Sequence, residues 1–330
     1  MSAYFETASG DLAAEALRSF ADVHHDLVWH HDQHGFLASR DTAAARTVAV
    51  LSGGGSGHEP LHCGYVGRGM LDAAVPGRVF ASPHNRQVYE ASLAVARPGG
   101  VLHLVKNYTG DRINFGIAAE RLAHIGIPCA RVLIDDDLAS DTQDIAAGRR
   151  GTGGTVLVEK ILGAAADTGM GLDSLRELGE RIVGGCRSLA VATAAHTSPA
   201  TGEPAFPLGA GELEYGVGIH GERARSTVAR RPLGNIVELM TGELLKAIPA
   251  DVPVICLVNG LGATTLLELY TAHGQLARVL REAEVPLARS LVGSYITSLD
   301  MHGLSITLMA ADSEVLSLYD APVHTPALRW

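Results

Sequence analysis

The stretch from Leu51 to Pro60 combines a backbone that could bind a small ligand with a base that could act on it. Its sequence is Leu-Ser-Gly-Gly-Gly-Ser-Gly-His-Glu-Pro. Four glycines around Ser56 let the backbone turn sharply and approach a ligand closely, and their amide groups can bind oxygens. His58 adds an imidazole that exchanges a proton near neutral pH. The alternative is that these glycines only make a tight strand-to-helix turn.

A second candidate site follows an apolar strand that we expect at residues 101–105. The segment Lys106-Asn-Tyr-Thr-Gly-Asp111 delivers a lysine, an asparagine, a threonine and a carboxylate within six residues. Open α/β sheets place their ligands at the carboxyl ends of strands, which is where these side chains would fall. Asp111 could equally be the N-cap of the helix that follows.

A third candidate is His220, in the segment Gly216-Val-Gly-Ile-His-Gly-Glu222. The glycines match the dinucleotide fingerprint formally, but no helix opens after them, so we interpret the match as false. The first glycine stretch likewise lacks the Gly-Lys-Ser/Thr ending of a Walker A motif. Nucleotide binding is therefore not supported, and His220 taken alone is more typical of a structural histidine.

The composition favours an ordinary globular protein. Apolar residues make up 47% and charged residues 19% of 330. The net charge of −10 argues against a nucleic-acid surface, and no apolar run is long enough to span a membrane. With no signal-peptide pattern at the N-terminus, we expect a cytoplasmic location. The four cysteines contain no Cys-x-x-Cys pair, so we expect reduced thiols.

The order of apolar segments predicts two α/β domains with mostly parallel or mixed sheets. Residues 1–185 would form an N-terminal domain with the glycine stretch, and residues 186–330 a C-terminal domain with His220. Residues 47–51 would be a strand that ends at the glycines. Residues 64–77 would be a broken helix and turn. Further expected strands are 131–134, 188–193, 252–258, 287–295 and 305–309, and the longer expected helices are 85–96, 155–166, 172–183, 233–247 and 266–283.

Three weaker candidates remain. The histidines between His24 and His34 could bind a metal, but a solvated, incidental cluster is the preferred interpretation. Asp135-Asp136-Asp137 could bind a cation, and a solvated loop at a strand end is again preferred. Arg149 and Arg150, between glycines, could meet a phosphate.

Six segments together resemble the substrate-binding subunit of dihydroxyacetone kinase, in that family's order and almost from one end of the sequence to the other. They are Leu51–Pro60, Lys106–Asp111, Gly148–Gly151, Gly216–Glu222, Thr297–Met301 and Ala321–Leu328. The resemblance implies a two-domain α/β fold of the same family type, usually a homodimer. It also implies that a histidine of the second domain captures a small ketose covalently.

Carried onto this sequence, the resemblance gives His220 the capture of the substrate's C2 carbonyl as a hemiaminal. Gly55, Ser56, Gly57, His58, Lys106 and Asp111 would bind the hydroxyls and the carbonyl oxygen. His58 and Asp111 are the candidates for removing the proton from the attacking hydroxyl. Arg149 and Arg150 stay candidates for contacting the transferred phosphate or the partner.

The resemblance also implies what this sequence does not supply. No cofactor is expected on it, and Mg-ATP or Mg-ADP would sit on a helical nucleotide-binding kinase subunit. A phosphotransferase-system phosphocarrier is a further candidate partner. The resemblance leaves ATP and a phosphotransfer relay open as phosphoryl donors.

Two departures leave the substrate's length open. The family usually continues with Pro-Gly after the capture histidine's Gly-Glu, where this sequence has Arg223-Ala224, and Ser82–Arg86 carries bulkier residues than expected. A four-carbon ketose such as erythrulose is therefore an alternative to dihydroxyacetone. A non-catalytic, dihydroxyacetone-sensing regulator is the alternative from another class. A sensor has no need of His58 and Asp111, which favours the kinase subunit.

Overall fold

The computed structural model describes residues 4–5, 10–141, 148–223 and 226–330. By their internal contacts they form two compact units, each with its own six-stranded sheet. The first unit comprises residues 6–134, 155–181 and 317–330, and the second comprises 1–5, 135–154 and 182–316. Both combine helices with a mixed sheet, which confirms the predicted α/β class. The predicted division at residues 185 and 186 stays a prediction, because the compact units take segments 135–154 and 317–330 from opposite sides of it.

The first unit contains a sheet of order β1-β2-β4-β3-β5-β6. Its strands are β1 (Val28–His31), β2 (Phe36–Ser39), β3 (Ala49–Ser56), β4 (Ala73–Val79), β5 (Val101–Lys106) and β6 (Cys129–Ile134). The four strands from β4 to β6 run parallel, and β1 and β2 add an antiparallel edge. Because β3 lies between β4 and β5, the glycine stretch is in the middle of the sheet.

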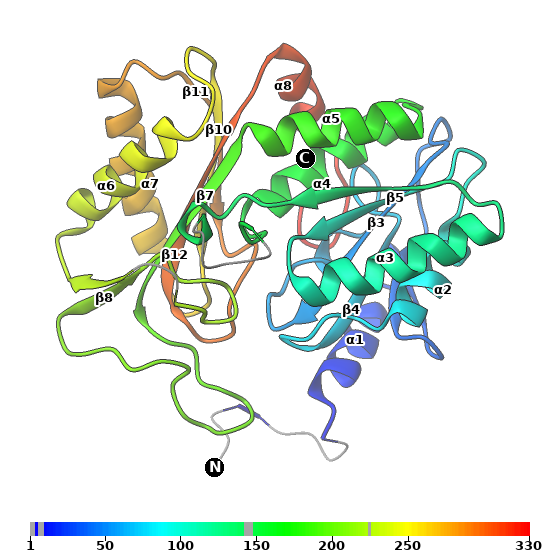
Figure 1. Ribbon diagram of the computed structural model, residues 1–330, viewed down its shortest axis with the longest axis horizontal. Coiled ribbons are helices and arrows are strands. Elements are labelled where there is room, and N and C mark those ends of the chain that lie inside the picture. The colour runs from blue at the N-terminus through cyan, green and yellow to red at the C-terminus, as the bar shows by residue number, and fades with distance from the viewer. Residues whose placement is uncertain (1–3, 6–9, 142–147, 224–225) are drawn as a thin grey trace. The chain divides into compact units, whose positions relative to one another are not determined.

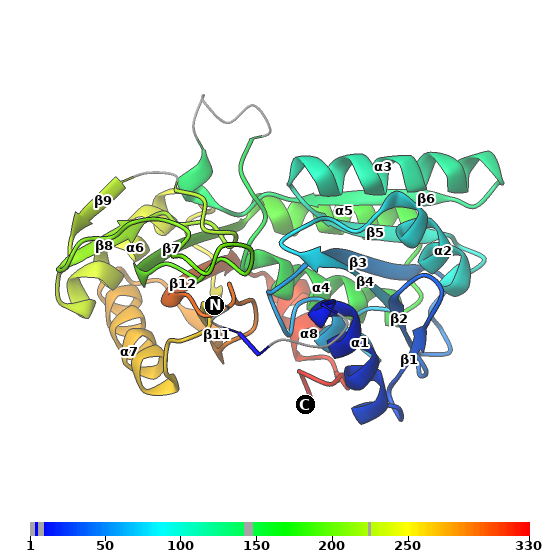
Figure 2. The same ribbon diagram turned by 90° about the horizontal axis from the view of Figure 1, so that it is seen from below.

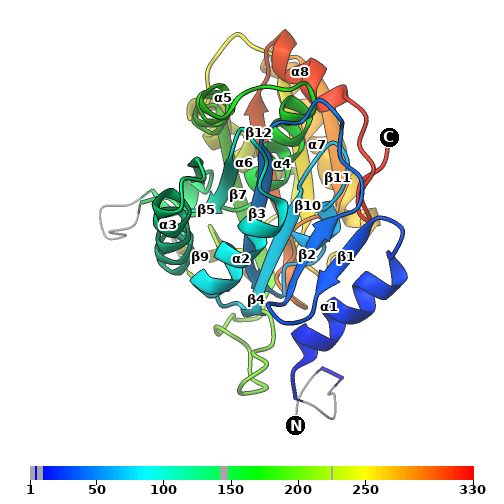
Figure 3. The ribbon, with the colours of Figure 1, turned by 90° about the vertical axis from the view of Figure 1, so that its right-hand side faces the viewer.

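Helices cover both faces of this sheet. Helices α2 (Asn85–Val95) and α3 (Thr109–His124) pack side by side on one face (Figure 1). Helices α4 (Gly154–Asp167) and α5 (Leu172–Gly184) lie on the opposite face, and α1 (Leu12–Val23) lies beside β1 (Figure 3). One short 3₁₀ helix, η1 (Cys63–Tyr65), follows the glycine stretch. Because helices cover both faces, β3 and β5 are buried along their whole length, as parallel strands usually are.

The second unit contains a sheet of order β11-β10-β12-β7-β8-β9. Its strands are β7 (Cys186–Ala194), β8 (Glu212–Tyr215), β9 (Ser226–Ala229), β10 (Val254–Gly260), β11 (Leu287–Gly293) and β12 (His302–Ala310). Only β10 and β11 are parallel among these pairs, and β7, β8 and β9 lie side by side (Figure 2). Helices α6 (Leu233–Lys246) and α7 (Leu266–Glu282) pack on one face. The short helices η2 (Leu138–Ser140) and α8 (Ser313–Asp320) complete the described elements.

Two local predictions were wrong. The glycines expected to form a turn instead extend β3 to Ser56, and β4 begins at Ala73, inside the segment 64–77 predicted as a broken helix and turn. Strand β4 contains Pro76 and Gly77, which are unusual in a strand interior and concealed it. The hairpin of β1 and β2 was not predicted either, because its strands have only four residues each.

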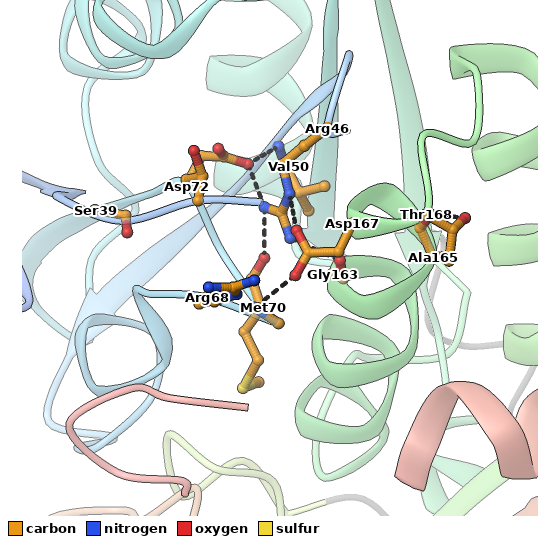
Figure 4. A network of polar contacts seen from close by, with 12 residues as sticks. Ser39, Arg46, Val50, Arg68, Met70, Asp72, Gly163, Ala165, Asp167 and Thr168 are labelled. Carbon is orange, nitrogen blue, oxygen red and sulfur yellow. Dashed lines mark hydrogen bonds and ion pairs between the residues drawn. The ribbon is translucent and has the colours of Figure 1, made fainter. Parts of the chain in front are cut away.

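A buried polar network around Arg46 ties the start of β3 to α4 (Figure 4). The Arg46 guanidinium donates to Asp72 and Asp167, each at 2.6 Å, and to the carbonyl oxygens of Met70 and Gly163. The Asp72 carboxylate also accepts from the amide of Val50. Every charge in this network, called the Arg46 network below, thus has an opposite charge or a backbone partner. No helix within the described ranges is long and apolar enough to cross a membrane.

Candidate functional site

The glycines of β3 let other groups lie directly against the backbone. A Cβ atom at Gly53 would overlap the carbonyl oxygen of Val75 on β4, and one at Gly54 would overlap the Nζ atom of Lys106. At Gly55, a Cβ would lie 2.7 Å from the amide nitrogen of Ala81. Glycine is therefore needed here for close approach, with the strand itself in regular pairing through Gly54.

The end of the stretch is fixed by contacts of its own. Ser56 donates a 2.7 Å hydrogen bond to the carbonyl oxygen of Gly77, and the amide of Gly57 donates to the Glu59 carboxylate at 3.0 Å. His58 is fully buried, with its ring stacked on Phe80 at a centroid distance of 5.0 Å. Burial and stacking restrict the orientation of this ring, as a base that acts on one proton needs.

Lys106 ends β5 and is buried against the glycine strand. Its side chain is 1% exposed, and Nζ lies 2.7 Å from Nε2 of His62 and 3.4 Å from the carbonyl oxygen of Gly53. On the far side of the imidazole, Nδ1 of His62 lies 2.5 Å from Oε1 of Glu159 and 3.0 Å from Oγ of Ser52. These side chains of Lys106, His62, Glu159 and Ser52 are called the Lys106 network.

Burial dominates the electrostatics of the Lys106 network. It raises the pKa of Glu159 to about 8, against the lowering effect of the Lys106 charge. Burial also lowers the pKa of Lys106, while the charges of Asp111 and Glu159 act to raise it. The pKa of His62 is lowered by burial and by the neighbouring charges of Lys106 and His58, so this imidazole is neutral at pH 7.

Asp111 lies in the first turn of α3 and is 3% exposed. The N-cap of that helix is Tyr108, so the alternative reading of Asp111 as the N-cap is wrong. Its Oδ1 atom is buried with no hydrogen-bond partner among the residues that the structure describes. A buried carboxylate oxygen that lacks a donor is costly, and such atoms concentrate at ligand sites.

His220 belongs to the second unit, where a carboxylate orients it. Nδ1 of His220 and Oε1 of Glu222 are 2.9 Å apart, and Oε2 of Glu222 accepts from the backbone amide of His220 at 2.9 Å. Nη1 of Arg150 is 3.8 Å from Oε2 of Glu222. Burial would raise the pKa of Glu222, but the His220 hydrogen bond and the nearby positive charges lower it to about 2. An ionised carboxylate accepts a hydrogen bond from Nδ1–H, and in the neutral ring the free lone pair is then on Nε2.

The arginines proposed for phosphate contact have carboxylate partners within their own unit. Arg150 donates to Asp137 at 2.7 Å, and Arg149 donates to Asp135 at 2.7 Å. The prediction of a solvated loop at the three aspartates was wrong for Asp136 and Asp137, which are buried. Asp136 accepts from both the amide and the hydroxyl of Thr152, so it holds the loop that carries the two arginines.

The histidine-rich segment, the remaining candidate, forms no metal site in the described part of the chain. No group of three or more His, Cys, Asp or Glu side chains there is arranged to hold a metal ion. In the histidine-rich segment, His30 pairs with Asp32, and His31 stacks on His34 and Phe36.

The two departures from the family pattern have local structural roles. His84, in the bulky segment, is the N-cap of α2 and forms a capping box with Gln87. Arg223 donates to the buried carboxylate of Glu214 at 3.1 Å, and Ala224 lies outside the described residues.

Sequence reasoning did not single out His62, Glu159 or Glu222. The run Thr155-Val-Leu-Val-Glu-Lys-Ile-Leu carried the available signal for Glu159, because charges inside an apolar helix are buried and need partners. Glu222 was visible only as part of a motif. His62 had no signal of its own, since its role depends on β5 and α4.

The sequence comparisons agree over nearly the whole length. Residues 18–327 match the model of the Dak1 domain. The dihydroxyacetone-binding subunit DhaK of the PEP-dependent dihydroxyacetone kinase of Escherichia coli K12 is 42% identical, covering 97% of each chain. The corresponding subunit of the PTS-dependent dihydroxyacetone kinase 1 of Listeria innocua is also 42% identical, over 92% of this chain and 93% of that protein.

Solved structures are similar in fold and sequence. The dihydroxyacetone kinase operon co-activator Dha-DhaQ superposes with a TM-score of 0.90 at 32% identity, over 96% of this chain and 98% of that one. The dihydroxyacetone kinase of C. freundii in complex with AMP-PNP and Mg²⁺ gives 0.89 at 33% identity, over 99% of this chain and 60% of that one. The chain belongs to the Dak1 domain family.

Proposed function

We propose that this protein is the substrate-binding subunit of a dihydroxyacetone kinase. It binds a small ketose and presents a terminal hydroxyl for phosphorylation by a nucleotide on a partner subunit. The E. coli and Listeria relatives carry that function in their names at 42% identity. The observation in this chain that carries the proposal is the orientation of His220 by Glu222.

His220 captures the ketose through Nε2. The nitrogen lone pair forms a bond to C2 as the carbonyl π electrons move to oxygen, and the oxygen takes up a proton. The imidazole loses its Nδ1 proton, so the net result is a neutral hemiaminal. The Glu222 carboxylate stabilises the positive charge that develops on the ring during the attack. A polyol such as glycerol has no carbonyl and escapes capture.

The residues of the first unit bind and activate the hydroxyls. Gly55, Ser56 and Gly57 supply backbone groups, and Lys106 supplies a positive charge for the substrate's oxygens. Oδ1 of Asp111, which has no hydrogen-bond donor in the described structure, can accept the proton of the attacking hydroxyl. His58 is the second candidate base. These roles rest on the family motifs and on the burial of all three titratable side chains.

The phosphoryl donor is proposed to come from outside this chain, as Mg-ATP or Mg-ADP on a nucleotide-binding partner. The term "dihydroxyacetone-binding subunit" in the names of the relatives supports a separate partner. Their "PEP-dependent" and "PTS-dependent" names favour a phosphotransferase-system phosphocarrier that recharges the nucleotide. A homodimer is part of the proposal from the family resemblance, and the cytoplasmic location rests on the sequence alone.

Two alternatives to a dihydroxyacetone kinase subunit each have a specific observation in their favour. Arg223 and the bulky Ser82–Arg86 segment support a four-carbon ketose such as erythrulose. The Dha-DhaQ co-activator supports a sensor, but its 32% identity is lower than the 42% of the kinase subunits. The presence of both His58 and Asp111 also favours the kinase.

Phosphorylation assays separate these alternatives. The purified protein would be incubated with dihydroxyacetone, erythrulose or glycerol and Mg-ATP, alone and with the candidate partner subunit. A parallel set replaces ATP by ADP, phosphoenolpyruvate and the phosphocarrier proteins. We expect turnover of a ketose only with the partner. Tight ketose binding without turnover in any combination would contradict the kinase and support the sensor.

A further inference from the structure

The Lys106 network extends from the glycine strand to the middle of α4, and no role assigned above uses His62 or Glu159. We propose that His62 and Glu159 are positioning residues that hold the Lys106 ammonium against the glycine strand and keep it protonated. This inference rests on the proposed function, which puts a ketose oxygen beside Lys106.

The contacts define the direction of each hydrogen bond. Ser52 donates its hydroxyl proton to the carbonyl oxygen of Leu104 at 2.9 Å, so towards His62 it acts as an acceptor. Nδ1 of His62 therefore carries the ring proton and donates it to Glu159 and Ser52. Nε2 then accepts from Lys106 at 2.7 Å. One of the three ammonium protons is committed to His62, and a second is donated to the carbonyl oxygen of Gly53 at 3.4 Å.

The distribution of charge supports the same assignment. An ammonium that is 1% exposed is stable only beside a compensating negative charge. Asp111 and Glu159 are the carboxylates that act on Lys106, and the other titratable groups around the network are His58 and Cys63. Asp111 is assigned to the reaction, where its charge changes as it accepts a proton. Glu159, at 0% exposure on the far side of His62, supplies a second negative charge when it ionises, near pH 8, and is not used in the reaction.

The glycine at position 54 fits this arrangement. A Cβ there would overlap Nζ of Lys106 and lie 3.3 Å from Nε2 of His62. The missing side chain thus makes the space in which the ammonium meets the imidazole. Two features thus let the Lys106 ammonium lie against β3. Gly54 has no side chain to exclude it, and the His62 imidazole accepts its hydrogen bond.

Lysine NMR tests this proposal directly, because the sequence contains only three lysines, Lys106, Lys160 and Lys246. Protein labelled with ¹³C at lysine Cε would be titrated, with the Lys106 signal assigned by its absence in Lys106→Met. In Glu159→Gln we expect the Lys106 midpoint to move to lower pH by about one pH unit, the effect of one charge at short range. In His62→Leu it should also move to lower pH, because the ammonium loses the acceptor of its 2.7 Å hydrogen bond. His62→Gln should keep the wild-type midpoint, since an amide can accept from Lys106 and donate to Glu159.

Lys160→Met is the matched control. Lys160 is the next residue on α4 and is also buried, but it donates to the carbonyl oxygen of Leu318 at 2.8 Å. Its replacement removes a buried charge from the same helix and should leave the Lys106 midpoint unchanged. An unchanged midpoint in Glu159→Gln would overturn the proposal. This isosteric variant carries the test by itself if His62→Leu does not fold.

Ketose binding provides the functional readout. The pH at which dihydroxyacetone affinity is half lost should move down in Glu159→Gln together with the Lys106 midpoint. A shifted midpoint with an unshifted binding profile would overturn the positioning role. If the wild-type protein binds no ketose at any pH, the proposed function fails, whereas the lysine titration still decides whether Glu159 and His62 control the charge of Lys106.

Discussion

The first unit contains two buried polar networks that differ in how completely their atoms are paired. In the Arg46 network, the guanidinium meets two carboxylates and two backbone carbonyls (Figure 4). In and beside the Lys106 network, Oε2 of Glu159 and Oδ1 of Asp111 are buried and have no hydrogen-bond partner among the described residues. A fully paired network contributes rigidity, whereas a network with unmatched atoms keeps the capacity to bind a ligand.

Burial also shifts the pKa values of the Lys106 network. In the Lys106 network, burial raises the pKa of Glu159 and lowers those of Lys106 and His62, so it disfavours the charged form of all three side chains. Perturbed pKa values of this kind gather at functional sites. The comparison predicts that mutations in the Arg46 network lower stability, whereas mutations in and beside the Lys106 network lower activity.

The largest effect is expected for Asp111→Asn. It removes the proposed base, so phosphorylation should fall by a factor of about 10²–10⁴, the usual contribution of a general base. Capture by His220 should be spared, because the substitution leaves the imidazole and Glu222 in place. The measurement is turnover with the partner subunit alongside ketose binding. Full turnover in the variant would remove Asp111 from the mechanism.

Arg46→Ala should mainly lower stability. It leaves Asp72 and Asp167 without their common cation, and breaking a buried ion pair in this way costs about 3–5 kcal/mol. Urea unfolding followed by circular dichroism measures the loss. Arg97→Ala is the control, since Arg97 is partly exposed and, within this group, donates to Oδ1 of Asp72 at 3.0 Å and to the carbonyl oxygen of Arg46 at 3.5 Å. Equal losses in the two variants would refute the central place of Arg46.

Glu222→Gln should weaken ketose capture tenfold to a hundredfold, because a hydrogen bond to a charged group contributes about 1.5–3 kcal/mol. The amide still accepts from Nδ1, so the ring keeps its orientation but loses the stabilising charge. Isothermal titration with dihydroxyacetone measures the affinity. Glu243→Gln serves as the matched control. Glu243 lies on α6 in the same unit and accepts a hydrogen bond from the Tyr215 hydroxyl. Unchanged affinity in Glu222→Gln would mean that the carboxylate charge plays no part.

The smallest expected effect is a pH-dependent difference in stability between the wild type and Glu159→Gln. The folded-state pKa of Glu159 is raised from its ordinary 4.5 to about 8, so the folded protein binds this proton more tightly than the unfolded chain. Its contribution is fully present below pH 4.5 and is lost as the pH rises to 8. The wild type should therefore lose stability relative to Glu159→Gln across this window. Parallel stability curves from urea unfolding at several pH values would contradict the raised pKa.

The sequence predicted much of the fold because apolar runs and helical periodicity are local signals. The predicted helix at residues 85–96 is α2, Asn85–Val95, and the predicted strand at 101–105 is β5. The glycines of β3 were misassigned because a glycine that avoids a lysine side chain looks the same in sequence as a glycine in a turn. That lysine lies more than fifty residues away in the chain, so only the folded sheet reveals the contact.

The candidate residues were found by their motifs, and their partners were not. His58, Lys106, Asp111 and His220 stand in glycine-rich or strand-end segments that can be recognised one at a time. Glu222, His62 and Glu159 acquire their roles only through distances to another side chain. A carboxylate that supports a site through another side chain can thus be identified only from the structure. An exception is an acid that interrupts an apolar helix, as Glu159 does in α4.

The most direct test of the account is ¹³C NMR of dihydroxyacetone labelled at C2, mixed with wild-type protein and with His220→Asn. In the wild type, the carbonyl resonance of the bound ketose should be replaced by that of a tetrahedral carbon, since capture converts C2 from sp² to sp³. In His220→Asn the tetrahedral signal should be absent, while Asp111→Asn retains it. A bound ketose that keeps its carbonyl resonance in the wild type, or a tetrahedral signal that survives in His220→Asn, would contradict covalent capture by His220.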